Sequence, residues 1–191
     1  MLLCFHLFSI IIFILLRLKV RKKILYFLLF ISSFVCFLFS TIFIVMISYG
    51  ESMIPNYYDK AILFFWQQDF DIKRNDVVAV RYPEKWSTNY EINFKRVIGL
   101  PGDEIQIVGD QLFINGRKTW YWDQALNDIL MGIENGRIKE DYYFIQGDNY
   151  FHSLDSRYIG FVHRSRILGK LLFIIYEGER PPGELMEDAV S

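Results

Sequence analysis

The feature that most restricts how this chain can fold is an apolar run near its start, Ile24–Ser48, which contains no charged residue. A helix that spans a bilayer needs about 20 apolar residues, because each residue adds about 1.5 Å against a hydrocarbon core of about 30 Å. The run is comfortably long enough, and a polar chain follows it. The sequence therefore predicts a membrane helix joined to a folded domain.

A first apolar run, Met1–Leu16, precedes this one and would measure roughly 24 Å as a helix, slightly less than the hydrocarbon core. A secretory signal peptide has basic residues before its apolar run and a small-x-small cleavage site after it, and this run has neither. We therefore expect two uncleaved transmembrane helices. The alternative is an interfacial or re-entrant first segment, which would move the N-terminus but not the domain.

The loop between the two runs is strongly basic; its charged residues are Arg17, Lys19, Arg21, Lys22 and Lys23. Basic loops beside membrane helices stay in the cytoplasm, so the chain after Tyr49 is expected on the other side of the membrane. Residues 1–49 are thus predicted to be a membrane anchor. Residues 50–176 are predicted to be an extracytoplasmic domain that begins at the bilayer surface.

Charge and cysteine content exclude several classes of function. The anchor carries five basic residues and no acidic one, whereas the rest of the chain has 16 basic and 22 acidic residues. A domain with this negative excess has no electrostatic basis for binding nucleic acid. Cys4 and Cys36 lie in the apolar runs, and His6, His152 and His163 are scattered, so we expect no disulfide, no metal and no other cofactor.

Short runs rich in β-branched residues, separated by turn residues, predict that the exported domain is mostly β. Gly109-Asp110 and Asn115-Gly116 are typical of tight hairpin turns. This pattern favours an antiparallel β-barrel or two packed sheets. The predicted strands are residues 61–66, 76–82, 90–100, 104–108, 111–114, 117–122, 142–146 and 167–176.

Two segments depart from this rhythm of short strands. Residues 123–139 are expected to form a small helical or irregular insertion. Residues 177–191, which contain Pro181-Pro182-Gly183 and several acidic side chains, are expected to form a flexible tail.

Ser52 lies where the apolar run ends and the polar domain begins. A serine before a proline-containing turn is usually only part of a loop, and its hydroxyl becomes a nucleophile only beside a base. His152, which is near Asp148 and Asp155 in sequence, would complete a Ser-His-Asp triad. Neighbours within one loop rarely face each other, however, and a solvated loop histidine is the simpler interpretation.

Lys95 is the other candidate base. A lysine amine can accept a proton when apolar surroundings keep it neutral. Lys95 lies in the apolar strand Ile92–Gly99 beside Arg96, and adjacent side chains of a strand face opposite ways, so Lys95 can point into a site while Arg96 points out. The alternative is a pair of solvated charges on an edge strand.

The polar loop 147–157 offers supporting residues. Ser153 is suited to hydrogen-bond an amine and orient it, and Asp155 can form a charge-assisted bond with Arg157 that stabilises the loop. The alternative is an ordinary surface loop.

Three groups of residues, in this order along the chain, carry a resemblance to a known family. They are Ser52-Met53-x-Pro55, then Lys95-Arg96-Val97-Ile98-Gly99-Leu100-Pro101-Gly102-Asp103, then Gly147-Asp148-Asn149 followed by Ser153, Asp155, Ser156 and Arg157. Their order and spacing resemble the conserved boxes of type I signal peptidases, and the membrane anchor fits that family. The similarity extends from Gly50 to Gly169.

The resemblance implies a membrane-anchored serine endopeptidase with a Ser-Lys dyad, which removes signal peptides from exported preproteins after a small-x-small pattern. Ser52 matches the nucleophile and Lys95 the general base. Ser153 matches the serine that holds the lysine, and Asp155 and Arg157 match a structural ion pair.

The resemblance also implies a substrate groove between residues 48–53 and residues 92–95, in which the preprotein lies as an added strand. Some family members have a hydroxyl two residues before the nucleophile as a second oxyanion donor, and here that position is Gly50. Asn93 departs from the apolar residues common at its position, which affects specificity rather than chemistry. The expected substrate-binding residues are Ser48, Gly50, Met53, Ile92, Asn93 and Phe94.

The resemblance places the chain in the bacterial inner (cytoplasmic) membrane with its catalytic domain on the periplasmic side. Its expected partners are the signal peptides of preproteins and the lipid bilayer, and we expect a monomer. Two alternatives remain: a conjugation-associated peptidase of the same clan that processes a pilin-like substrate, and an inactive membrane-anchored peptide-binding module. The long box 95–103 favours the general enzyme over the first, and the joint presence of Ser52 and Lys95 argues against the second.

Overall fold

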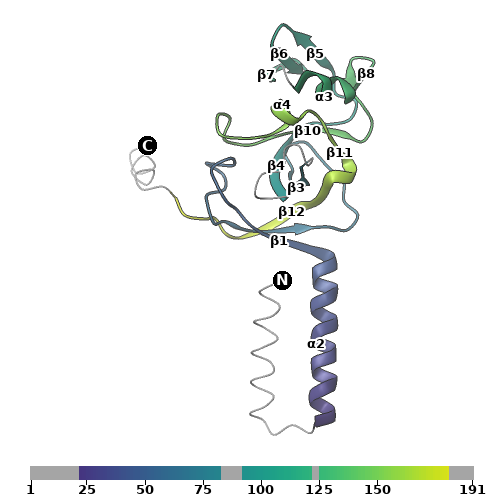
Figure 1. Cartoon of the computed structure of the whole chain (residues 1–191), viewed down its shortest axis with the longest axis vertical. Helices are drawn as coiled ribbons and strands as arrows, with labels where there is room; N and C mark the ends of the chain where they lie inside the picture. The colour runs from purple at the N-terminus through teal and green to yellow at the C-terminus, as the bar shows by residue number, and fades with distance from the viewer. Residues whose placement is uncertain (1–21, 83–91, 122–124, 181–191) are drawn as a thin grey trace. The chain divides into compact units, whose positions relative to one another are not determined.

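The computed structural model describes residues 22–82, 92–121 and 125–180. The chain divides into two compact units, Met1–Ile44 and Val45–Ser191. The first contains a long helix and the second is mostly β (Figure 1).

The helix of the first unit is α2, Lys22–Ile42. Its 21 residues span about 32 Å at about 1.5 Å per residue, none of them is buried, and the helix is long and apolar enough to cross a membrane. Within the described part of the chain, one such helix is found where two were predicted. The predicted first helix, Met1–Leu16, and residues 17–21 of the basic loop lie outside the described residues.

The sequence predicted that the second apolar run is helical as far as Ser48, and this prediction is wrong. The helix ends at Ile42, and strand β1, Phe43–Ile47, follows directly. Residues 41–47 include five β-branched side chains, which lose rotamer freedom in a helix and fit a pleated sheet better. The apolar character of the run is therefore shared by two kinds of element.

The second unit is built on a seven-stranded sheet in the order β1-β2-β12-β3-β4-β10-β11, and the pairings from β2 to β11 are antiparallel. Its other strands are β2 (Ile62–Trp66), β12 (Ile167–Tyr176), β3 (Val77–Arg81), β4 (Ile92–Gly99), β10 (Tyr142–Gln146) and β11 (Val162–His163).

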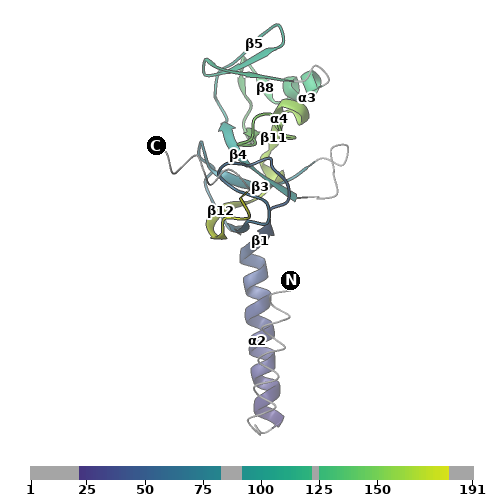
Figure 2. The ribbon, with the colours of Figure 1, turned by 90° about the vertical axis from the view of Figure 1, so that its left-hand side faces the viewer.

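Two smaller antiparallel sheets complete the second unit: β5-β6-β7 and β8-β9. They lie with helix α3 at one end of this unit, away from β12 and β1, in both views (Figures 1 and 2). The bounds are β5 (Ile105–Val108), β6 (Gln111–Ile114), β7 (Arg117–Trp120), α3 (Leu126–Met131), β8 (Ile133–Glu134) and β9 (Arg137–Ile138). A one-turn helix α4 (Ser156–Ile159) and the 3-10 turn η3 (Arg164–Arg166) flank β11.

The prediction of a mostly antiparallel β domain is confirmed, and each predicted strand has a counterpart within a few residues. Of the two predicted architectures, an antiparallel barrel or two packed sheets, the barrel is wrong for the described chain, because the large sheet is open, with β1 and β11 at its edges. β11 pairs with β10 through two residues, and no pairing among the described strands joins it to β1. The segment predicted as an insertion, 123–139, contains α3 and the β8-β9 pair.

Two apolar clusters lie in the second unit. One is in the end formed by the small sheets: Ile105, Leu112, Ile114, Tyr121, Ala125, Ile129, Ile138, Phe144 and Phe161. The other lies on the large sheet: Val78, Val80, Tyr82, Val97, Ile145, Ile159, Val162 and Ile167. Strands β4 and β10, which carry or border the candidate site residues, are held between these clusters through Val97, Phe144 and Ile145.

The first four residues of the predicted flexible tail are held against the domain. Residues 177–180 run beside Asp59: the Glu179 N–H donates to the Asp59 carbonyl at 2.8 Å, and the Lys60 ammonium pairs with the Glu179 carboxylate at 2.7 Å. Gly178 at φ +98 permits the turn that brings these groups together. The rest of the predicted tail, 181–191, lies outside the described residues.

Candidate active site

Ser52 lies in a series of turns that joins β1 to β2. The Ile54 N–H donates to the Glu51 carbonyl at 3.2 Å, and the Asn56 N–H donates to the Met53 carbonyl at 3.1 Å. The Met53 side chain is only 1% exposed, so it anchors the turn in the domain. This arrangement leaves the Ser52 side chain half-buried at the surface of the turn.

Lys95 reaches Ser52 from the middle of β4. On the neighbouring strand it is in register with Val78, and its side chain is 2% exposed. The Nζ atom lies 2.8 Å from Ser52 Oγ and donates to the Phe94 carbonyl at 3.0 Å. Two residues that are 43 positions apart are therefore within hydrogen-bond distance.

The Lys95 pKa is lowered from its ordinary value of 10.5 to about 8. The main cause is burial, which disfavours the charged ammonium; the carboxylates of Asp155 and Asp148 oppose it. Each of these carboxylates is paired with an arginine, and within the described chain neither forms an ion pair with Lys95. A substantial fraction of the amine is therefore neutral near pH 8.

The loop 147–157 holds the backbone on the other side of Ser52. The Asn149 N–H donates to the Ser52 carbonyl at 3.0 Å. The Asp155 carboxylate accepts from the Gly147 N–H at 2.9 Å and forms a fully buried ion pair with Arg157 at 2.7 Å. Asp155 is also the N-cap of α4, so the same side chain starts that helix and fixes the loop.

A second arginine–carboxylate pair lies on the opposite face of β4. Arg96 Nε and Nη2 donate to the Asp148 carboxylate at 2.7 and 2.5 Å, and Asn56 Nδ2 donates to the same group at 2.8 Å. The pair connects the strand that carries Lys95 with the turn that carries Ser52. Sequence reasoning did not assign this role, although the opposite charges of Arg96 and Asp148 were visible.

Ser153 does not make the contact with the lysine amine that the resemblance implies. Its Oγ is buried and has no hydrogen-bond partner among the described residues. It lies close to Gly147: a Cβ atom on Gly147 would be 2.2 Å from Ser153 Oγ and 2.4 Å from the Ser52 carbonyl oxygen. Only glycine fits at position 147, because the loop approaches the Ser52 backbone so closely.

Comparison with known proteins shows the family of the chain. The family model described as signal peptidase, peptidase S26, matches residues 21–176. The chain belongs to this family. Membership makes the chain a serine endopeptidase, and therefore a hydrolase.

The relatives of this S26-family chain include several bacterial signal peptidases. Signal peptidase I P of Bacillus subtilis subsp. natto is 38% identical over 133 residues, which cover 63% of this chain and 70% of the relative. Signal peptidase I of Bacillus licheniformis is 33% identical over 140 residues, which cover 66% and 73%. A crystal structure of a signal peptidase I from Enterococcus faecalis aligns with 28% identity and a TM-score of 0.36, over 54% of this chain and 98% of that one.

A small groove of about 30 Å³ adjoins the serine and the lysine in this signal peptidase family member. It is lined by Met46, Ile47, Tyr49, Ser52, Ile92, Asn93, Phe94 and Lys95. The Phe94 ring, which is 6% exposed, packs edge-on against Tyr57 at 5.8 Å between ring centroids and near Phe65 at 6.1 Å. One lining residue of the groove is therefore packed into an aromatic cluster.

Three predicted substrate-binding residues do not line this groove, although Ile92, Asn93 and Phe94 do. Ser48 is 3% exposed, and its backbone bonds to Ala61 and Lys60. Met53 is buried in the domain, and Gly50 is exposed with its N–H bonded to Asp59 Oδ1 at 2.9 Å.

Sequence reasoning missed two groove residues, Met46 and Ile47, whereas Tyr49 lies in the segment 48–53 that was expected to form one side of the groove. Met46 and Ile47 belong to the end of β1, in the segment predicted to be helical. The dense β-branched residues of 41–47 were the available signal for that strand.

The two histidines of the described residues, His152 and His163, take no part in this site. His152 is exposed, His163 bonds to Ser165, and within the described chain neither is hydrogen-bonded to Ser52. The same part of the chain contains no group of three His, Cys, Asp or Glu side chains arranged to hold a metal ion.

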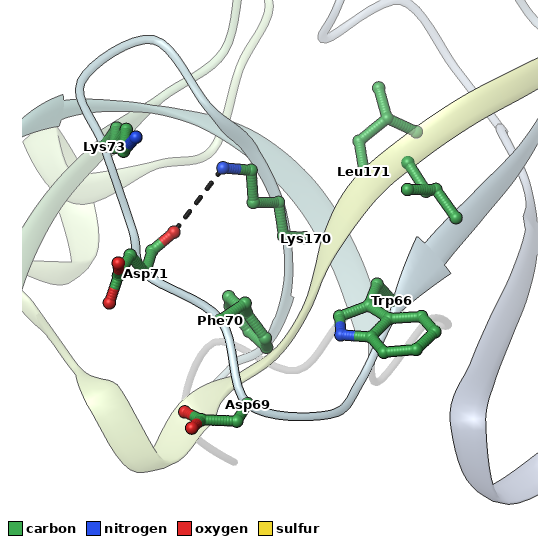
Figure 3. A pocket seen from close by; sticks show the side chains of 8 residues that line it. Trp66, Asp69, Phe70, Asp71, Lys73, Lys170 and Leu171 are labelled. Carbon is green, nitrogen blue, oxygen red and sulfur yellow. Dashed lines mark hydrogen bonds between the residues drawn. The ribbon is translucent and has the colours of Figure 1, made fainter.

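A larger surface pocket, of about 510 Å³, lies elsewhere on the second unit (Figure 3). It is formed by the end of β2, the following loop and the middle of β12, with Trp66, Phe70 and Leu171 among its lining residues. Its Lys170 ammonium is paired with Asp76 at 2.8 Å. The pocket is larger than the groove, but neither Ser52 nor Lys95 lines it, so we do not assign the reaction to it.

Proposed function

We propose that this chain is a signal peptidase I, which removes signal peptides from exported preproteins with Ser52 as the nucleophile and Lys95 as the general base. The observation that carries the proposal is the 2.8 Å approach of Lys95 Nζ to Ser52 Oγ, combined with the lowered pKa of that buried amine. A serine hydroxyl needs a base in contact, and a neutral lysine supplies one.

The geometry supports a two-step reaction. Neutral Lys95 accepts the hydroxyl proton while Ser52 Oγ attacks the scissile carbonyl, and the resulting ammonium gives that proton to the leaving amine. An acyl-enzyme remains. Lys95 then accepts a proton from the attacking water and returns it to Ser52 Oγ as the ester bond breaks. No net proton is gained or lost by the enzyme over the cycle.

The oxyanion of the tetrahedral intermediates is assigned to the Ser52 backbone N–H. This group has no hydrogen-bond acceptor among the described residues, so it is available to substrate. Gly50 adds no hydroxyl, and its N–H is already bonded to Asp59. Removing one oxyanion donor typically raises the activation free energy by about 2.7 to 4 kcal/mol. With no donor from Gly50, the Ser52 N–H is the donor to which we assign this stabilisation of the oxyanion.

We further propose residues 1–49 as the anchor, 50–176 as the catalytic domain, 123–139 as an insertion and 177–191 as a tail. α2 would hold the catalytic domain at the bacterial inner membrane, and the basic residues Lys22 and Lys23 at its start support a cytoplasmic beginning and a periplasmic catalytic domain. The enzyme would act as a monomer in contact with lipid and preprotein.

The substrate preference provides the first test of this proposal. The full chain in detergent micelles is expected to cleave a preprotein with alanine immediately before the scissile bond. Cleavage should be lost when that alanine is replaced by tryptophan, because a groove of about 30 Å³ holds a methyl group but not an indole. The products are measured by gel shift and N-terminal sequencing. If no preprotein is cleaved, the peptide-binding alternative is favoured.

The pH dependence of cleavage provides a second test. Since only the neutral amine can accept the Ser52 proton, kcat/KM is expected to rise with pH through a midpoint near the Lys95 pKa of about 8. The sign follows from deprotonation: activity is low below this pH and reaches a plateau above it. A midpoint near about 6.5 would instead indicate a histidine base and contradict the assignment.

A further inference from the structure

The guanidinium of Arg157 lies against two aromatic rings that come from different parts of the second unit and that contact each other at 6.2 Å between centroids. Its Cζ is 4.8 Å from the ring centroid of Trp120, on β7, and 4.4 Å from that of Tyr150, in the loop 147–157. A third ring, Tyr158, packs edge-on against Trp120 at 5.2 Å. The small three-stranded sheet thus contributes a side chain to the structure around the candidate site.

Each of the three nitrogens of the same guanidinium donates a hydrogen bond. Nε and Nη2 donate to the two Asp155 oxygens at 2.8 and 2.7 Å, and Nη1 donates to the Tyr150 carbonyl at 2.6 Å. Arg157 and Asp155 are both 0% exposed. Bonded through its nitrogens and in contact with two aromatic rings, the guanidinium keeps its charge in a site shielded from water.

Asp155 connects the Arg157 side chain to the backbone around Ser52. It accepts the Gly147 N–H, and Gly147 lies directly against the Ser52 carbonyl. Two residues further on, the Asn149 N–H bonds to that same carbonyl. Any change in the Asp155–Arg157 pair therefore affects the backbone that holds Ser52 beside Lys95.

We propose that Trp120 and Tyr150 are positioning residues, which hold Arg157 on Asp155 and thereby keep the loop 147–155 in place against Ser52. This inference rests on the proposed Ser52–Lys95 mechanism. Neither ring belongs to the sequence boxes that carry the family resemblance, and Trp120 lies on a sheet that supplies none of the groove residues.

The arrangement has an electrostatic consequence at Lys95. The carboxylates that act on this amine are Asp155 and Asp148, neutralised by Arg157 and Arg96 respectively. If the rings no longer hold Arg157, the Asp155 charge is less well neutralised and water can enter. Both changes favour the ammonium, so the pKa of Lys95 rises toward its ordinary value.

The test compares Trp120→Ala with Trp120→Phe in the full chain, using the preprotein assay. Trp120→Ala is expected to lower kcat at pH 8 about tenfold with KM changed less than about twofold, and to move the rising limb of the pH profile upward by about half to one unit. Trp120→Phe keeps a ring over the guanidinium and should restore both values toward wild type.

Two further variants separate positioning from general stability. Phe113→Ala removes a half-buried ring from β6 of the same sheet and should leave kcat and the pH limb unchanged. Tyr150→Leu removes the second ring at a residue that is 36% exposed, so it tests the proposal even if Trp120→Ala does not fold. We expect Tyr150→Leu to shift the limb in the same direction as Trp120→Ala.

The outcomes distinguish this inference from the proposed function. If wild type does not cleave preprotein, or if Ser52→Ala does, the mechanism fails. If wild type cleaves with Ser52 and Lys95 required, but the folded Trp120→Ala and Tyr150→Leu variants keep wild-type kcat and pH limb, only the positioning role is overturned. An equal loss in Phe113→Ala would also overturn it.

Discussion

Replacing Ser52 with alanine is expected to reduce preprotein cleavage by roughly 10⁴- to 10⁶-fold, the loss seen when a serine nucleophile is removed. The substitution removes the Oγ atom that lies 2.8 Å from Lys95 Nζ and leaves the turn intact, because the turn is held by backbone bonds and by buried Met53. The first-order rate under saturating enzyme is the measurement. The melting temperature should stay close to that of wild type.

Ser165→Ala is the matched control for this variant. Ser165 is an exposed serine in η3 whose Oγ lies 2.8 Å from His163 Nδ1. It is not among the residues that line the candidate groove. Its removal should leave the cleavage rate unchanged. Measurable turnover by purified Ser52→Ala, with products at the same site, would exclude Ser52 as the nucleophile.

The β character of the domain could be predicted because its signals are local. The turn Gly109-Asp110 lies between two short apolar runs, and β5 and β6 pair around it as a hairpin with Val108 opposite Gln111. Such turns depend on two or three adjacent residues and need no knowledge of the rest of the fold. The open sheet could not be predicted, because closure depends on whether distant edge strands such as β1 and β11 meet.

The end of the membrane helix was mispredicted because hydropathy does not distinguish a helix from an apolar strand. No proline, glycine or charge marks the change at Ile42, and only the density of β-branched residues does. The error had a consequence for the site, since Met46 and Ile47 of β1 line the groove. A boundary shift of a few residues therefore changed the list of candidate substrate contacts.

The contact between Ser52 and Lys95 depends on the tertiary structure, so local sequence patterns could not establish it. Composition and strand pattern alone favoured Lys95 as a solvated charge on an edge strand, whereas β4 is an interior strand between β3 and β10. Burial on that strand lowers the amine pKa, which no local pattern reports. The packing of Trp120 on Arg157 escaped prediction for the same reason, whereas the Asp155–Arg157 pair, two residues apart, was visible in the sequence.

Replacing Lys95 with methionine is expected to abolish cleavage while making the protein more stable at neutral pH. Methionine keeps the shape of the side chain but cannot accept the Ser52 proton, so the rate should fall by roughly 10⁴-fold or more. Lys95→Arg should be equally inactive, because a guanidinium stays protonated at every accessible pH. Cleavage by either variant at more than about one hundredth of the wild-type rate would contradict the role of general base.

The stability change distinguishes loss of the base from damage to the fold. Because the Lys95 pKa is about 8 in the folded protein against 10.5 ordinarily, the unfolded chain binds a proton that the folded protein releases between these values. Wild-type stability therefore rises with pH across this window, and at neutral pH the buried amine costs about 3 kcal/mol. Lys95→Met should recover most of that cost at pH 7, and its stability should no longer rise with pH. Denaturant unfolding at pH 7 and pH 10 measures both effects.

Lys118→Met is the control for this experiment. It replaces an exposed lysine on β7 and should follow the wild-type pH dependence of stability. If wild-type stability does not rise between pH 7 and pH 10 relative to Lys95→Met, the Lys95 pKa is not lowered in the folded protein, and the neutral-lysine mechanism is contradicted.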